Sequence, residues 1–268
     1  MSDYRLSHLS GHLGDIALHH WPVPQPRFLV LLVHGYGEHL ARYHHVAEKL
    51  NQLGGYVFGP DHLGHGLSQG ERVLIEDYEA VVDDVHLAVV SVRQQFPDLP
   101  LVIIGHSMGG MIATRYVQRF ADEVRALVLS GPLLGEHTQI SDMFGLADIP
   151  DTPLDIRTLS RDPEVGAKYQ ADPLVWHGPF KRATLGAMCD MLSTIHHGPG
   201  FGSLPTLWLH GEGDKLVLPN ESQQTLNKLR GSDFDRELYS GAQHEIFNET
   251  NRDEVLRRVS GFIVRALG

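Results

Sequence analysis

The chain has 268 residues, a formal net charge of −11 and a hydrophobic share of 42%. That length suits one large α/β domain or two small ones, and the composition is typical of a globular protein with a sizeable core. The acidic balance argues against a nucleic-acid-binding protein, which usually carries a basic surface.

Apolar strand patterns alternate with amphipathic helical patterns in the first half of the chain, which predicts βαβ units and a mostly parallel sheet. Alternation over 16–23 indicates an early antiparallel strand. The continuous apolar run at 27–35 is typical of a buried central strand. The next predicted elements are a helix at 41–55, a strand at 56–61, a long helix at 75–96, a strand at 101–105 with a helix after it, and a strand at 124–132.

The rhythm changes after Pro132. Residues 133–200 contain no convincing buried strand, only short helical pieces divided by proline and glycine. Strand patterns resume at 204–214 and 234–244, and a last helix is predicted at about 252–267. We therefore predict an α/β core formed by residues 1–132 and 201–268, with a helical cap at 133–200 inserted into it.

The sequence Gly105-His106-Ser107-Met108-Gly109 fits the pattern G-x-S-x-G between a predicted strand and a predicted helix. Such an elbow exposes the serine hydroxyl at the carboxyl edge of the sheet, and the following helix points its N-terminal N–H groups toward it. Ser107 is the predicted nucleophile. An ordinary strand-to-helix turn with an incidental serine is the alternative.

A serine nucleophile needs a base and an orienting acid. In this class of fold they follow the serine in the order acid, histidine, and Asp214 and His244 each come directly after a predicted strand. We predict Asp214 as the acid and His244 as the base. Asp61 also follows a strand and competes as the acid, although a turn-organising role is favoured for it.

A negatively charged tetrahedral intermediate would need two hydrogen-bond donors. The segment "VHGYGEH" follows the central strand, and we assign the two donors to the main-chain N–H groups of Tyr36 and Met108. Structural roles are expected for the neighbouring histidines: hydrogen-bonded pocket walls for His34, His39 and His65, and packing against the sheet for His106.

The motifs "HGYGEH", "DHLGHGLSQGER", "GHSMGG", "HGEGDKLV" and "GAQHEIFNE" together resemble the monoacylglycerol lipase and lysophospholipase branch of the α/β-hydrolases. The resemblance extends from about Trp21 to the C-terminus. It implies an α/β-hydrolase fold with the cap inserted after the sixth strand, and ester hydrolysis through an acyl-enzyme on the predicted triad. It also places Glu38 and Arg42 at the head-group end of the pocket. Tyr36 stands where better-known members carry a small residue, so its phenol is expected to narrow or re-aim the acyl channel.

Several alternatives stay open at this stage. A lysophospholipase or general carboxylesterase would use the same residues, as would an acyltransferase or a peptidase on this scaffold. A catalytically inactive ligand-binding module is the alternative from another class. The apolar residues of the cap at 143–150 and 185–195 are expected either to touch lipid aggregates or a membrane surface transiently, or to pack on the core.

The remaining features indicate no cofactor. The 18 histidines lack the spacing of a metal site, so no metal is expected. Cys189 is the only cysteine, which excludes an intrachain disulfide. Neither a signal-peptide pattern nor an apolar stretch near the roughly 20 residues of a membrane span is visible. A cytoplasmic enzyme acting on a small lipid ester is the expectation.

Overall fold

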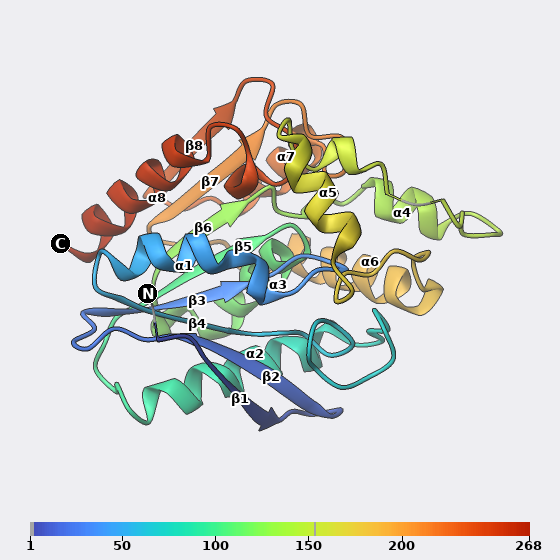
Figure 1. The fold of residues 1–268 in the computed structure, drawn as a ribbon. Coiled ribbons are helices and arrows are strands. Elements are labelled where there is room, and N and C mark those ends of the chain that lie inside the picture. Colours follow the sequence, from blue (N-terminus) through green and yellow to red (C-terminus); the bar gives the residue numbers. More distant parts are fainter. Residues whose placement is uncertain (1–2, 153) are drawn as a thin grey trace.

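A computed structural model describes residues 3–152 and 154–268. Eight strands form one sheet in the order β1-β2-β4-β3-β5-β6-β7-β8, and only the pairs β1–β2 and β2–β4 are antiparallel (Figure 1). The strands are β1 (Arg5–Ser10), β2 (Asp15–Trp21), β3 (Phe28–Val33), β4 (Gly55–Pro60), β5 (Leu101–His106), β6 (Val124–Ser130), β7 (Thr206–Gly211) and β8 (Phe234–Tyr239).

The central strands are apolar because both faces of the sheet are covered. Every residue of β3, β4, β5 and β7 is buried, as expected for parallel strands between two helical layers. One layer contains α1 (His44–Asn51) and α8 (Arg252–Leu267). The other contains α2 (Tyr78–Arg93), α3 (Met108–Phe120) and α7 (Pro219–Leu229).

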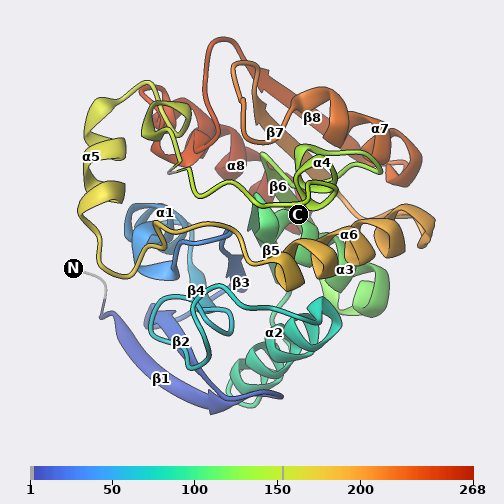
Figure 2. The same cartoon turned by 90° about the vertical axis from the view of Figure 1, so that its right-hand side faces the viewer.

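The segment between β6 and β7 is helical, as predicted. It contains α4 (Gln139–Phe144), α5 (Pro163–Ala171) and α6 (Arg182–His197), and these helices lie beyond the end of the sheet toward which the parallel strands run (Figures 1 and 2). Helix α6 packs on the same core as α3 through Met188, Met191 and Ile195. Helix α6 therefore packs against the helical layer that contains α3, whereas Phe144 and Leu146 at the end of α4 are exposed.

The sequence patterns located most elements within a few residues but missed some. Strand β1 escaped prediction because it is an edge strand whose side chains are almost all exposed, so it has no apolar face. The helix predicted at 41–55 divides into a 3₁₀ turn at Leu40–Tyr43 and the shorter α1. No helix in the described part of the chain is long and apolar enough to cross a membrane.

Candidate active site

Ser107 occupies the turn between β5 and α3. Its backbone has φ 54° and ψ −121°, a left-handed conformation that costs about 1–3 kcal/mol in a non-glycine residue. Neighbouring backbone groups hold the turn: Ser107 N donates to Ser130 O at 3.0 Å, and Ser107 O accepts from Leu133 N at 2.9 Å. The strained residue is thus fixed by hydrogen bonds to the end of β6 and the chain beyond it.

The glycines of the motif are required by close backbone contacts. A Cβ atom on Gly105 would lie 2.4 Å from Gly109 O, and one on Gly109 would lie 2.0 Å from Val33 O. Both distances are far shorter than a carbon–oxygen contact allows. The pattern G-x-S-x-G is therefore a packing requirement where α3 starts against β3.

Asp214 and His244 follow β7 and β8, and their side chains meet. His244 Nδ1 lies 2.7 Å from Asp214 Oδ2, and both residues are buried. Asp214 Oδ1 accepts the backbone N–H groups of Leu216 and Val217 at 2.8 and 3.0 Å. These bonds orient the carboxylate. Oδ1 binds the backbone of its own loop, and Oδ2 contacts the imidazole of His244.

The electrostatics of this pair favour a charged carboxylate and a basic imidazole. Burial alone would raise the pKa of Asp214, but the charge of His244 and hydrogen bonds from His210 and His244 hold it below its usual range. Burial alone would lower the pKa of His244, but the charge and hydrogen bond of Asp214, with contributions from Glu245 and Glu38, raise it above the ordinary 6.5. Asp214 is therefore ionised at neutral pH.

Two residues that support the pair were not identified from the sequence. His210 Nε2 lies 3.1 Å from Asp214 Oδ2 and is fully buried. Glu249, also buried, accepts the backbone N–H of Gln243, which precedes His244, at 2.7 Å, and it accepts from Arg161 Nε at 2.9 Å. No local sequence signal distinguishes either residue from an ordinary strand or loop residue.

The segment between β6 and β7 is joined to the loop that carries His244. The backbone N–H groups of His244 and Glu245 donate to Thr158 O and Leu159 O at 3.3 and 2.8 Å. Arg161 extends this contact through its bonds to Glu249. The position of the imidazole therefore depends on the cap segment as well as on the sheet.

Ser107 and His244 both line one cavity of about 560 Å³ between the sheet edge and the cap. Much of its wall is apolar or aromatic. Its lining includes Tyr36, Leu133, Ile140, Met143, Leu154, Ile156, Leu159, Trp176, Phe180, Met188, Leu216 and Val217. A hydroxyl and an imidazole at such a cavity, with a carboxylate bonded to the imidazole, are the side chains that covalent acyl transfer needs.

The two predicted oxyanion donors lie at the same cavity. Tyr36 and Met108 are both in its lining, and Met108 begins α3, where backbone N–H groups have no partner inside the helix. The Tyr36 ring stacks on Phe180 with centroids 4.3 Å apart. This stack forms part of the wall at the position where a narrowed channel was expected.

Glu38 and Arg42 differ in their access to the cavity. Glu38 is among its lining residues, and its carboxylate accepts from Gly35 N at 2.7 Å and from Tyr43 OH at 2.6 Å. Arg42 is not among them, and its guanidinium is paired with Glu38 and Glu245. The family resemblance placed both residues at the head-group end of the pocket, but only Glu38 lines the cavity.

Asp61, the competing acid, has a different environment. Its carboxylate accepts the backbone N–H groups of Leu40 and Leu67, both at 2.8 Å, and lies 3.0 Å from His19 Nε2. The Leu40 contact joins the loop after β3 to the loop after β4, the Leu67 contact lies within the latter loop, and the His19 contact ties Asp61 to β2. The favoured turn-organising interpretation agrees with them.

The other histidines near the site are hydrogen-bonded, but the expectation that His34, His39 and His65 form pocket walls is wrong, because none of them lines the cavity. Their polar partners are instead Gly35 O for His34, Asp172 for His39 and Leu63 O for His65. His106 does reach the cavity and donates from Nδ1 to Ser130 O at 3.0 Å. Burial and the charge of His244 lower the pKa of His106 to about 4, so its imidazole is neutral.

Comparison with known proteins gives one family. The family model described as "Serine aminopeptidase, S33" matches residues 24–251. A monoacylglycerol lipase of Mycolicibacterium smegmatis is 35% identical over 100% of both chains. Among solved structures, the Paleococcus ferrophilus monoacylglycerol lipase is 26% identical with a TM-score of 0.77, covering 98% of this chain and 99% of that one. A soluble variant of the Saccharomyces cerevisiae monoglyceride lipase, solved with a substrate analogue, shares the fold at 22% identity, with a TM-score of 0.85 and coverage of 98% and 95%.

Proposed function

The chain belongs to the monoacylglycerol lipase branch of the α/β-hydrolases and is a carboxylic ester hydrolase, and we propose that it cleaves monoacylglycerols to a fatty acid and glycerol. The observation that carries this proposal is the 2.7 Å contact between His244 Nδ1 and Asp214 Oδ2 at a cavity that Ser107 shares. The lipase names of the relatives support the choice of substrate.

The proposed reaction has two steps. His244, oriented by Asp214 through Nδ1, accepts the Ser107 proton at Nε2 while the hydroxyl oxygen attacks the ester carbonyl. The main-chain N–H groups of Tyr36 and Met108 stabilise the oxyanion, each contributing about 3–4 kcal/mol by analogy with known donors. The alcohol leaves with a proton from His244, and water then hydrolyses the acyl-enzyme by the same route.

The cavity supports a substrate with one long apolar chain and a small polar head. Its methionines, Met108, Met143 and Met188, are adaptable side chains that suit an irregular acyl pocket. The carboxylate of Glu38 is the polar group proposed to face the glycerol hydroxyls, with Arg42 behind it. A lysophospholipase or a general carboxylesterase with the same triad is the second candidate, since these enzymes use the same catalytic groups and differ in the shape of the pocket.

The cap adds a proposal about how the substrate arrives. Phe144, Leu146 and Leu154 are 40%, 46% and 38% exposed, which is unusual for large apolar side chains gathered in one segment. Met143 and Leu154 also line the cavity. We propose that this part of the cap touches lipid aggregates transiently, while α6 serves as packing.

A substrate panel tests the function. It contains monoacylglycerols of graded chain length, di- and triacylglycerols, lysophosphatidylcholine and p-nitrophenyl esters, with Ser107→Ala as the control for each. We expect the highest kcat/KM on monoacylglycerols and complete dependence on Ser107, together with fluorophosphonate labelling of that serine. Activity restricted to lysophosphatidylcholine or to p-nitrophenyl esters would replace the substrate assignment, and turnover by a clean Ser107→Ala enzyme would refute the nucleophile.

A further inference from the structure

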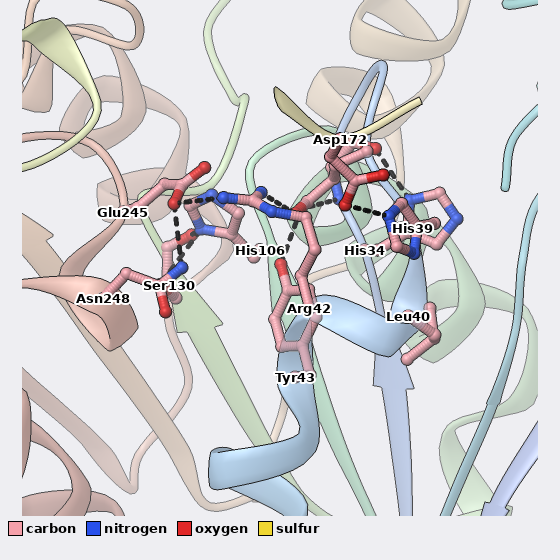
Figure 3. A network of polar contacts seen from close by, with 12 residues as sticks. His34, His39, Leu40, Arg42, Tyr43, His106, Ser130, Asp172, Glu245 and Asn248 are labelled. Carbon is pink, nitrogen blue, oxygen red and sulfur yellow. Dashed lines mark hydrogen bonds and ion pairs between the residues drawn. The ribbon is translucent and has the colours of Figure 1, made fainter. Parts of the chain in front are cut away.

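Three charged side chains, Glu38, Arg42 and Glu245, form a buried cluster beside the loop that carries His244. Figure 3 labels Arg42 and Glu245 of this cluster. Arg42 Nη1 lies 2.5 Å from Glu38 Oε2, and Arg42 Nη2 lies 2.7 Å from Glu245 Oε2. The three side chains are 11%, 5% and 5% exposed in the order Arg42, Glu38, Glu245. One guanidinium thus joins two carboxylates that are more than 200 residues apart in the chain.

Glu38 connects this cluster to the loop that carries the backbone N–H of Tyr36, one of the two proposed oxyanion donors. Its Oε1 atom accepts from Gly35 N at 2.7 Å, and Gly35 directly precedes Tyr36. A Cβ on Gly35 would lie 3.0 Å from that oxygen and 3.2 Å from Ser107 Cβ, so the loop passes close to the nucleophile. Any movement of Glu38 would therefore displace the backbone that carries the Tyr36 N–H.

Glu245 connects the cluster to the base. It directly follows His244, and its Oε2 atom accepts from Asn248 Nδ2 at 2.8 Å as well as from Arg42. Its backbone N–H is fixed by Leu159 O. The carboxylate of Glu245 therefore secures the loop that carries the imidazole.

Arg42 also contacts an aromatic ring of the cap segment. Its guanidinium carbon lies 5.0 Å from the centre of the Tyr169 ring on α5, a cation–π arrangement that covers one face. A planar, two-pronged guanidinium can hold two carboxylates in fixed directions, which a lysine ammonium cannot. Removing it would leave two buried carboxylates without their counter-charge, which is costly.

We propose that Arg42 is a positioning residue. By bridging Glu38 and Glu245, it holds the loop that carries the Tyr36 N–H in a fixed position relative to the loop that carries His244. The proposal rests on the proposed ester hydrolysis and deepens it. It assigns Arg42 to alignment of the reacting groups and not to recognition of the glycerol head. Misplacing catalytic groups by about 1 Å can cost about 100-fold in rate.

Two substrates separate alignment from head-group binding. A monoacylglycerol carries glycerol, whereas p-nitrophenyl butyrate does not. We expect Arg42→Met to lower kcat by about 10- to 100-fold on both substrates, with a smaller change in KM. Arg42→Lys should recover part of the loss, because it restores the charge without the fork. A rise in KM for the monoacylglycerol alone, or an unchanged kcat on both substrates, would overturn the proposal.

A matched control is available in Arg119, which bridges Glu79 and Asp83 at 2.9 and 2.5 Å and does not line the cavity. Arg119→Met should leave kcat unchanged on both esters. Ser107→Ala enzyme run in parallel separates the two proposals: residual turnover there contradicts the hydrolytic mechanism, whereas a normal Arg42→Met enzyme beside an inactive Ser107→Ala enzyme contradicts only the role of Arg42.

The pH dependence of kcat/KM gives a second measurement, one that a purely structural role of Arg42 would not change. Glu245→Gln is a second variant, of nearly unchanged side-chain volume, in case Arg42→Met folds poorly. The charged and titratable groups around His244 are Asp214, Glu245, Glu38 and the imidazole of His106. Loss of the Glu245 charge disfavours imidazolium, so the acid limb of kcat/KM should move to lower pH. Loss of the Arg42 charge should move it to higher pH. Acid limbs that coincide with that of the unaltered enzyme in both variants would contradict the bridge.

Discussion

Trp208 and His210, which project from the same face of β7, are joined by a hydrogen bond from Trp208 Nε1 to His210 Nδ1 at 3.1 Å. Because an indole N–H can only donate, His210 Nδ1 is unprotonated and the ring proton is on Nε2. That atom lies 3.1 Å from Asp214 Oδ2 and 2.9 Å from Val217 O. The Nε2–H of His210 thus donates to the same carboxylate oxygen that contacts His244 Nδ1.

Replacing His210 tests this support. His210→Phe removes a hydrogen bond to a charged acceptor, worth about 1.5–3 kcal/mol, so we expect kcat/KM on a monoacylglycerol to fall by about 10- to 100-fold. Trp208→Phe keeps the His210 donor and should cost less. Steady-state kinetics of the two variants would contradict the assignment if Trp208→Phe proved the more damaging.

The identity of the acid is tested by a pair of isosteric changes. Asp214→Asn lets His244 adopt the wrong tautomer and should lower kcat by about 10⁴-fold without loss of fold. Asp61→Asn should instead lower the melting temperature, because Asp61 holds Leu40 N and Leu67 N, and should leave the kcat of the folded enzyme near normal. The reverse pattern would mean that the acid had been misassigned.

The pH–rate profile follows from the His244–Asp214 pair. The base must be neutral to accept the Ser107 proton, and the pKa of His244 is raised above the ordinary 6.5 by Asp214. Activity should therefore increase with pH through a midpoint above 6.5. The kcat/KM profile on a neutral ester measures it, and a midpoint clearly below 6.5 would show that imidazolium is not stabilised as the contacts indicate.

The packing requirement at the elbow predicts a stability difference between two glycines. Gly109→Ala would place a methyl group 2.0 Å from Val33 O and should cost more than about 4 kcal/mol or prevent folding. Gly261 lies in α8 with nothing within 4 Å of an added Cβ, so Gly261→Ala should stabilise the chain by about 0.4–1 kcal/mol. Denaturant unfolding of both variants checks the contrast, and equal effects would contradict it.

The sequence was informative where function depends on local backbone geometry. Ser107 and Asp214 each follow a strand whose apolar pattern is readable, and His244 follows β8, which is largely polar. Parallel strands bring the carboxyl ends of all three strands to one edge. The bend at Ser107 needs glycines at fixed spacing, so it leaves a signature within five residues. The helical character of the segment after β6 was visible for the same reason, from proline and glycine punctuation.

Long-range polar contacts left no such signature. Arg42 and Glu245 are separated by about 200 residues, and neither residue type indicates its partner. His210 looks like any strand residue until Trp208 and Asp214 are seen on either side of it. The pocket-wall interpretation of His34 and His65 was wrong because a motif can place a residue near an edge without fixing the direction of its side chain.

The hydrogen bonds from His244 and Glu245 to Thr158 and Leu159 bear on how such enzymes can be recombined. A chimera that exchanges residues 133–200 for those of a distant relative would disrupt these two backbone hydrogen bonds, which hold the loop that carries His244. Its seam would have to include the residues from Gln243 to Glu249 as well. Exchange of the cap segment would therefore disturb His244 as well, because residues 158–159 of that segment and residues 244–245 are joined by backbone hydrogen bonds.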